Sequence, residues 1–529
     1  MKQINNYRSW FNLMLLATCL TFGCKKNIDE IKQESGKISS IDAKNRSLKL
    51  SNLSVQRSDE LMEGFSLMLR DALADDVELR RFLKNEALKK FDLDYDILYG
   101  MIKDKTVSNN QTFREKLLKY VNSEQELFEF EESLPLLTIY VPEIPNFSAE
   151  KWNAESEKPA VSTGIINKNK MVTYYLNDGE QEEKLVDLVP GFPLLVIKNN
   201  ERVVLSEHAN ELKITNTSRI TTASNNYVFT SENFNGLSEN QKTNSSKVGG
   251  GATTNSTCLN CSLDDKLSTA FDLWQQYGTN NIWQRDYIYY SITPNSPNGP
   301  LDTRYQETIT ALKFKTGKEA YDKISDQSED PYAIHDPNSP TNSPTASWTE
   351  GSFEFKVTVL INNTQGLGTV ITKLFPVSPS RLFFLRYVAQ GNNYYTLSIT
   401  PIQCDLNEVV AAWDIKNNGV AWKVTLSEAD ASSTITTSQT NTSQFATNFG
   451  FDLSKIGLKF GTSSTTTSVS NYSIATQVGD DQLGEGAIYF YDPVVISWDI
   501  IPGVGAQSYT FKDIDTGWAL LTIQPKKVF

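Results

Sequence analysis

The hydrophobic period of the chain changes near Leu134, and this change most constrains the fold. Before it, apolar residues from Leu61 to Ala72 recur at the spacing of one helical face, which predicts a helical region over residues 57–131. After it, runs rich in β-branched and aromatic residues alternate with turn residues, as is typical of strands. The chain is therefore predicted to be α+β. A small N-terminal helical and β-rich region precedes a mainly antiparallel β-sandwich domain.

Capping signals divide the helical region. Asp75 with Glu78, Thr112 with Glu115 and Ser123 with Glu126 have the spacing of a capping box, so helices should start near residues 76, 113 and 124. The first helix should stop near Asp75.

The strand candidates that follow group into a β-rich unit over residues 132–222, packed on the helices. They are Leu136–Val141, Met171–Leu176, Leu194–Ile197 and Arg202–Leu205. A turn is expected at Asn177-Asp178-Gly179. A hairpin is expected at Asn199-Asn200, because Asn tolerates positive φ.

The remaining chain divides by composition. Residues 223–262 are a polar linker, and residues 263–278 form a short helix capped by Ser262. Residues 282–500 are predicted to be the β-sandwich domain, and residues 501–529 a C-terminal tail in which Trp518–Ile523 forms a last strand. The strand candidates of the sandwich are Tyr287–Tyr290, Phe353–Ile361, Leu382–Val388 and Tyr394–Ile399.

The N-terminus has the features of an export signal. Lys2 and Arg8 precede an apolar run that is too short to span a membrane comfortably. The run ends in Leu20-Thr21-Phe22-Gly23-Cys24, which resembles the lipobox of bacterial lipoproteins. The resemblance implies that residues 1–23 are a lipoprotein signal peptide, cut before Cys24, and that Cys24 is acylated. Residues 24–56 then form a flexible polar tether.

The lipoprotein interpretation of the N-terminus determines the expected location and partners. Several acyl chains on one residue give stable anchoring, so we expect an outer-membrane lipoprotein that faces the periplasm or the cell surface. The membrane is one partner, through the N-terminal lipid, and an unknown protein or glycan ligand is another. A formal net charge of −13 repels phosphate backbones, which argues against nucleic acid.

Cysteine spacing leaves alternatives open. Cys258 and Cys261 form a CxxC pair, for which a disulfide is the natural state in an oxidising envelope. One of them could instead pair with Cys404. The spacing also suits zinc or a thioredoxin-like redox role, but no second ligand pair and no supporting βαβ pattern accompany it.

Loop carboxylates are candidates for a calcium site at one end of the sandwich. They are Asp326, Asp330, Asp336, Glu428, Asp430 and Asp480. Asp92, Asp94 and Asp96 resemble the start of an EF-hand loop, but Ile97 stands where Gly should turn the chain and Lys103 replaces the closing Glu. A solvated junction between helices is therefore the preferred interpretation of that motif, and no cofactor other than calcium is indicated.

Evidence for catalysis is sparse. His208 and His335 are the two imidazoles, and no G-x-S-x-G elbow occurs, so catalysis is not favoured. We expect a non-catalytic binding or interaction role. One alternative is a pore-forming effector that uses the Ser/Thr-rich residues 432–473, which resemble the stem of aerolysin-like proteins in composition. Another is a sandwich hydrolase or calcium-dependent binder.

An aromatic binding face, with core packing as its alternative, is suggested by Tyr287, Tyr289, Tyr290, Tyr394, Tyr395, Trp413 and Trp422.

Six segments resemble a group of uncharacterised outer-membrane or surface lipoproteins of Bacteroidota-type bacteria. They are residues Phe91–Tyr99, Leu134–Pro142, Trp348–Phe353, Asn448–Phe451, Lys455–Gly461 and Asp480–Asp492. The resemblance implies a location at the envelope and implies no particular activity.

Overall fold

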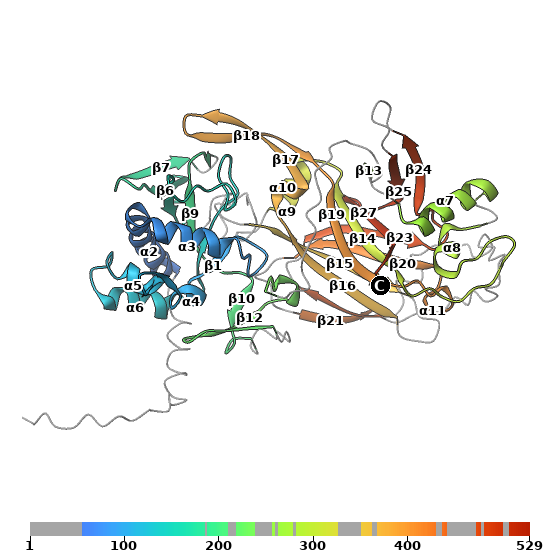
Figure 1. Cartoon of the computed structure of the whole chain (residues 1–529), viewed down its shortest axis with the longest axis horizontal. Helices are drawn as coiled ribbons and strands as arrows, with labels where there is room; N and C mark the ends of the chain where they lie inside the picture. Colours follow the sequence, from blue (N-terminus) through green and yellow to red (C-terminus); the bar gives the residue numbers. More distant parts are fainter. Residues whose placement is uncertain are drawn as a thin grey trace, which may run out of the picture. The chain divides into compact units, whose positions relative to one another are not determined.

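The first helix forms on the apolar stripe that the sequence predicts. The computed structural model describes residues 55–185, 188–209, 218–237, 257–259, 263–278, 282–325, 351–361, 368–429, 436–441, 472–477, 481–500 and 507–528. Helix α2 (Val55–Asp75) ends at the predicted residue, and Phe65, Leu69 and Ala72 on its apolar face are fully buried. It packs against a β-sheet whose strands are given below (Figure 1).

Side-chain caps set the starts of the next helices. Helix α3 (Val77–Ala87) begins one residue later than predicted, because Asp76 rather than Asp75 accepts hydrogen bonds from the first-turn amides. Helix α5 (Phe113–Leu117) starts at the predicted capping box of Thr112 and Glu115, in which both hydrogen bonds form. Helix α6 (Glu124–Ser133) is capped by Ser123, also as predicted.

A six-stranded sheet gathers most of the strands of the first half of the chain. Its order is β1 (Asp96–Leu98), β4 (Leu137–Tyr140), β9 (Leu194–Asn199), β5 (Ala160–Ser162), β6 (Met171–Tyr175) and β7 (Gln181–Leu185). The pairings are antiparallel except for β5 with β9, which is parallel. Helix α2 contacts β5, β6 and β9, and the helices and this sheet share one hydrophobic core. Strand β1 comes from the stretch that was predicted to be helical, as does the short helix α4 (Tyr99–Ile102) that follows it.

The predicted hairpin at Asn199-Asn200 is wrong. Strand β9 belongs to the six-stranded sheet, whereas β10 (Val203–Leu205) pairs with β12 (Asn226–Phe229) in a second sheet that also holds β11 (Arg219–Thr221). The Asn200 side chain accepts hydrogen bonds from the amides of Arg202 and Val203, at 2.9 and 3.0 Å. These bonds turn the chain away from β9 instead of folding it back. Strand β12 lies in the stretch predicted to be a polar linker.

Two four-stranded antiparallel sheets dominate the second half of the chain. One has the order β19 (Cys404–Ala411), β14 (Tyr305–Phe314), β27 (Ala519–Lys527) and β26 (Asp513–Asp515). The other has the order β16 (Thr369–Val377), β15 (Phe353–Ile361), β20 (Ala421–Glu428) and β23 (Asp481–Tyr489). Both contribute to one hydrophobic core, in which the rings of Phe314 and Phe355 lie 5.9 Å apart. The α+β fold class is thus confirmed.

The segment Tyr287–Tyr290 is a helix and not the strand that its composition predicts. It forms the end of α8 (Gln284–Tyr290), which follows α7 (Asp265–Tyr277) and packs on it. The Asp286 carboxylate accepts from the Trp283 amide at the helix start, and most of α8 is buried in the core. Tertiary burial therefore outweighs the β-propensity of its aromatic residues. Helix α7 is capped by Asp264, whereas Ser262 lies outside the described residues.

Shorter elements complete the described chain. They are β2 (Thr106–Ser108), β3 (Gln111–Thr112), β8 (Val189–Pro190), η1 (Glu232–Phe234), β13 (Thr257–Leu259), α9 (Lys318–Ile324), α10 (Pro379–Leu382), β17 (Phe383–Gln390), β18 (Asn393–Pro401), α11 (Ile415–Asn418), β21 (Thr436–Asn441), β22 (Tyr472–Gln477), β24 (Val495–Ile500) and β25 (Gln507–Phe511). Residues 53–529 form one compact unit. Within the described ranges, the helices all fall short of the length and apolarity needed to cross a bilayer.

Candidate functional site

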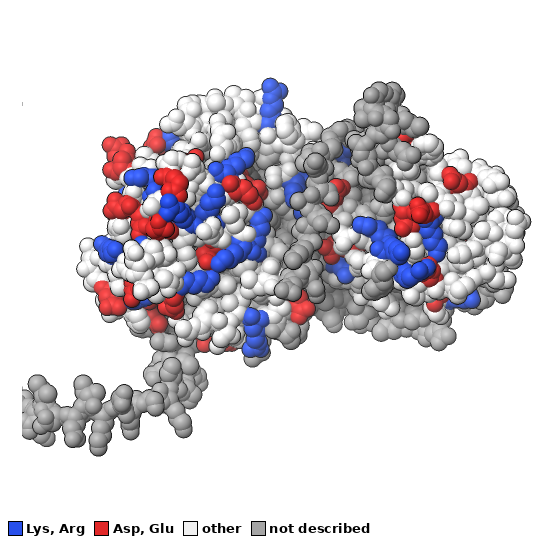
Figure 2. All heavy atoms as spheres, viewed as in Figure 1, with Lys and Arg blue, Asp and Glu red and all other residues white. Residues whose placement is uncertain are grey.

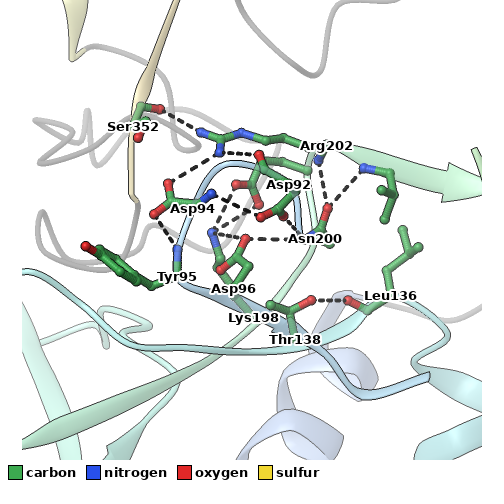
Figure 3. A network of polar contacts seen from close by, with 12 residues as sticks. Asp92, Asp94, Tyr95, Asp96, Leu136, Thr138, Lys198, Asn200, Arg202 and Ser352 are labelled. Atoms are coloured by element: carbon green, nitrogen blue, oxygen red, sulfur yellow. Dashed lines mark hydrogen bonds and ion pairs between the residues drawn. The ribbon is translucent and has the colours of Figure 1, made fainter. Parts of the chain in front are cut away.

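A buried ionic cluster joins three segments that are distant in the sequence (Figure 3). Asp92, Asp94 and Asp96 come from the turn between α3 and β1, where Leu93 has a left-handed backbone with φ of 72°. The Asp92 carboxylate accepts from the Asp94 amide at 3.2 Å, and the Asp94 carboxylate accepts from the Tyr95 amide at 2.8 Å. These local bonds hold the turn and place all three acids in the interior, so the predicted solvated junction is wrong.

The end of β9 supplies the groups that face these acids. Asn200 donates to Asp92 Oδ2 at 2.8 Å and to Asp96 Oδ2 at 3.3 Å. The Lys198 ammonium lies 3.5 Å from Asp96 Oδ2 and 3.0 Å from a Glu201 carboxylate oxygen. Alternate residues of Lys198-Asn199-Asn200-Glu201-Arg202 thus meet alternate residues of the Asp92–Asp96 motif.

Arg202 connects this cluster to the start of β15. Its guanidinium donates to Glu354 Oε1 at 2.6 and 2.9 Å, to the Asp92 carbonyl oxygen at 3.1 Å and to the Ser352 carbonyl oxygen at 3.4 Å. Its Nη1 also lies 3.4 Å from Asp94 Oδ2, and the Arg202 residue is only 1% exposed. A fully buried guanidinium therefore bridges the first half of the chain and the second.

Gly351 makes this approach possible. A Cβ atom at this position would lie 1.7 Å from Asp94 Oδ2, closer than non-bonded atoms can come. Only a residue without a side chain lets the backbone of the β15 segment pass so near the carboxylate.

The cluster holds more acids than bases. Five carboxylates, those of Asp92, Asp94, Asp96, Glu201 and Glu354, surround the two cations Lys198 and Arg202. Burial raises the pKa of Asp92 to about 6 and the pKa of Glu354 to about 7, although Arg202 opposes both shifts. Burial also raises the pKa of Asp96 well above its usual range, against the pull of Lys198.

For two members of the cluster, the pKa shifts in the direction that favours the charged form. Burial opposes ionisation of Glu201, but Lys198 and Arg202 outweigh it, so the pKa of this carboxyl is lowered. Burial likewise opposes the charge on Arg202, but Glu354 and the neighbouring acids raise the pKa of its guanidinium. The cluster is thus an arrangement of fixed ion pairs with surplus carboxyls that favour protonation.

A metal role for this cluster is not supported. The ammonium and guanidinium groups already stand among the carboxylates, where a divalent cation would have to bind. Across the described ranges, His, Cys, Asp and Glu side chains do not gather in groups of three or more that could hold a metal ion. The geometry fits a structural junction and not a coordination site.

No family model, curated protein or solved structure significantly matches this chain.

Most of the predicted calcium residues lie outside the described residues, namely Asp326, Asp330, Asp336, Asp430 and Asp480. The exception is Glu428, the last residue of β20, which is 1% exposed. It stands opposite Phe355 on one neighbouring strand and opposite Asp481 on the other. Burial in mid-sheet does not resemble the open loop position that the calcium hypothesis requires.

The remaining predicted residues are partly placed. Cys24, Cys261 and His335 lie outside the described residues, and Cys258 belongs to β13, opposite Tyr509 of β25. Cys404 is a free thiol at the start of β19, so it does not form the alternative disulfide. It is buried, and burial raises its pKa to about 11.

His208 follows β10 in a turn, and its Nε2 lies 3.8 Å from Glu207 Oε1. Strands β21 and β22 pair at the ends of the Ser/Thr-rich segment, whose middle is not described.

A second buried ion pair lies in the core of the second half. Arg285 of α8 donates to both carboxylate oxygens of Glu307, at 2.6 and 3.2 Å, and Tyr289 donates to the same carboxylate at 3.2 Å. The guanidinium also covers the Trp413 ring at 5.3 Å and donates to the Asp492 carbonyl oxygen. Most of the aromatic residues proposed for a binding face are core residues instead, because Tyr289, Tyr290, Trp413 and Trp422 are all buried.

Two other aromatic residues belong to a long hairpin formed by β17 and β18. On one of its faces, Leu385 and Ile399 pack on the core of the second half, whereas Tyr387 and Tyr394 pack on the core of the first half. The end of β18 pairs with β8, and Asn146 donates to the Tyr394 hydroxyl at 2.8 Å. The hairpin thus forms a second junction between the two halves.

The opposite side of this hairpin exposes apolar side chains to solvent. Phe384 is 62% exposed, Leu397 56%, Val388 46% and Tyr395 38%. Phe384, Arg386 and Val388 alternate along β17 and so share a face, on which Tyr395 lies opposite Val388. Leu397 is also exposed, at an irregularity in the strand pairing where the register assigns it to neither side. We call Phe384, Arg386, Val388 and Tyr395 the hairpin face. The sequence indicated its strands but not its exposure, because alternation does not reveal which side is covered.

Replacing Arg202 tests the ionic cluster. Arg202→Met should lower the free energy of unfolding by about 3–5 kcal/mol, because it leaves Glu354 and Asp94 buried without their cation. Urea denaturation measures the change. Arg219→Met, on the exposed position of β11, serves as a control and should change stability by less than about 0.5 kcal/mol. Equal stability of the two variants would contradict the structural role.

The pH dependence of stability tests the surplus of acids. The folded state keeps the Glu354 proton up to about pH 7, whereas the unfolded state loses it near pH 4.5. The stability that this group provides is therefore complete at low pH and disappears as the pH rises through this window. Relative to the parent, Glu354→Gln should gain up to about 3 kcal/mol between pH 5 and pH 8, measured by urea denaturation. Glu180→Gln, in an exposed turn, should run parallel to the parent.

Proposed function

We propose that this chain is a lipid-anchored cell-envelope protein with a non-catalytic binding role, held at the outer membrane by Cys24. In this proposal the two four-stranded sheets are the layers of a β-sandwich domain. Support for the sandwich comes from the shared core, to which β14 and β27 contribute from one sheet and β15 and β20 from the other. The lipid anchor rests on the lipobox-like sequence before Cys24.

The observation that carries the binding role is the hairpin face. Large apolar side chains that stay in water cost free energy, and a cluster of them commonly marks an interaction site. Here the opposite face of the same two strands is fixed by packing on both cores, so the exposed side cannot turn inward. The raised pKa values of Asp92, Asp96 and Glu354 belong instead to a buried cluster that holds the fold together.

The lipid anchor can be tested by substitution of Cys24. Cys24→Ser should abolish incorporation of labelled palmitate and leave the signal peptide uncut, because the thiol is the acceptor of the first acyl chain. Cys19→Ser removes a cysteine from the same apolar run and is the matched control, which should still be labelled. Mass spectrometry of the N-terminal peptide gives the result. An unmodified Cys24 in the parent protein would refute the anchor.

The binding role can be tested on the chain from Lys25 onward, which keeps all described elements and lacks the acylated residue. This form should sediment with outer-membrane vesicles from a Gram-negative bacterium. The double variant Phe384→Ser/Val388→Ser should bind at least about tenfold more weakly, since each side chain contributes about 1.5–3 kcal/mol when it is fully buried.

Leu185→Ser on β7 is the control, because Leu185 is 51% exposed but lies outside the hairpin face. It should bind like the parent. Equal sedimentation of all three proteins would show that the hairpin face takes no part in binding.

A further inference from the structure

We propose that the hairpin face binds the surface of a lipid bilayer and so gives the protein a second membrane contact besides its acyl anchor. This inference rests on the proposed function, because it names the occupant of the same face. Phe384 and Val388 would enter the boundary between headgroups and acyl chains. The Tyr395 hydroxyl would stay at headgroup level, and Arg386 would meet lipid phosphates.

The shape of the hairpin fits contact with the interface but not passage through the bilayer. Strands β17 and β18 have 8 and 9 residues. One face of the hairpin packs on the protein cores, and only the other face is exposed to solvent. Strand β17 is the outer strand of its sheet, so its outward amide and carbonyl groups lack a neighbouring strand. Such groups must remain where water or headgroups can satisfy them.

The charge around the hairpin favours an anionic surface. Residues 374–404 contain no Asp or Glu and two Arg, although the whole chain carries a net charge of −13. At the position of the hairpin labelled in Figure 1, the surface in Figure 2 is mostly uncharged and a basic side chain projects from it. Anionic lipids attract such a patch. A second copy docked face to face would instead bury Arg386 without an acidic partner from residues 374–404, which disfavours a dimer through this face.

Protein-free vesicles test this inference with the chain from Lys25 onward. The parent should float with vesicles of phosphatidylcholine and phosphatidylglycerol, and Phe384→Ser/Val388→Ser should bind at least about tenfold more weakly. Arg386→Gln should lose about fivefold on these anionic vesicles at low salt and little on pure phosphatidylcholine. The control Leu185→Ser should match the parent.

Each other outcome overturns the inference in a different way. Binding to outer-membrane vesicles but not to protein-free vesicles would point to a protein or glycan partner and leave the proposed function standing. Vesicle binding that is unchanged by the Phe384→Ser/Val388→Ser substitutions would place the lipid contact elsewhere. A dimer seen by analytical ultracentrifugation in the parent and lost in the double variant would assign the face to a second copy. Failure to bind either kind of vesicle would refute both proposals.

Discussion

The buried guanidinium of Arg202 is the interaction on which the union of the two halves depends. It joins the Asp92–Asp96 turn, the end of β9 and the start of β15, which are separated by more than a hundred residues from each other along the chain. Removing a guanidinium from water is expensive, so this arrangement persists only because carboxylate and carbonyl oxygens surround it. The requirement extends to Gly351, whose missing side chain leaves room for Asp94.

The two buried ion clusters differ in their ratio of carboxylates to cations. Arg285 and Glu307 form a one-to-one pair with two hydrogen bonds, and Tyr289 donates to the same carboxylate. The Arg202 cluster has five carboxylates for two cations, so some of its acids are more stable in protonated form within the fold. The first cluster fixes α8 in the core through these hydrogen bonds. The second makes the junction between the halves respond to the pH of its surroundings.

The sequence predicted local structure better than it predicted long-range pairing. The end of α2 and the caps Thr112 and Ser123 follow from residues a few positions apart, and they were correct. The Asn199-Asn200 hairpin failed because Asn200 bonds to the following amides and to the distant Asp92. The Tyr287–Tyr290 strand failed because burial on several sides outweighs β-propensity.

The candidate sites show the same contrast between local features, which the sequence reveals, and long-range partners, which it does not. The spacing of Asp92, Asp94 and Asp96 was visible in the sequence, but their partners Lys198, Asn200 and Arg202 lie about a hundred residues away. Without those partners, three alternating acids resemble a cation site more than a salt-bridge cluster. The calcium candidates other than Glu428, like Cys24, lie outside the described residues, so those hypotheses remain predictions.

The same charge distribution that would draw the hairpin face to a membrane would also orient the protein there. Residues 374–404 carry two positive charges, so the rest of the chain carries a formal net charge of −15. An anionic bilayer would then attract the hairpin, while the net charge of the rest of the chain would oppose its approach. The same net charge opposes association between copies in solution, where the apolar side chains would otherwise promote it. An exposed apolar face is thus compatible with a protein that stays dispersed until a surface of suitable charge is near.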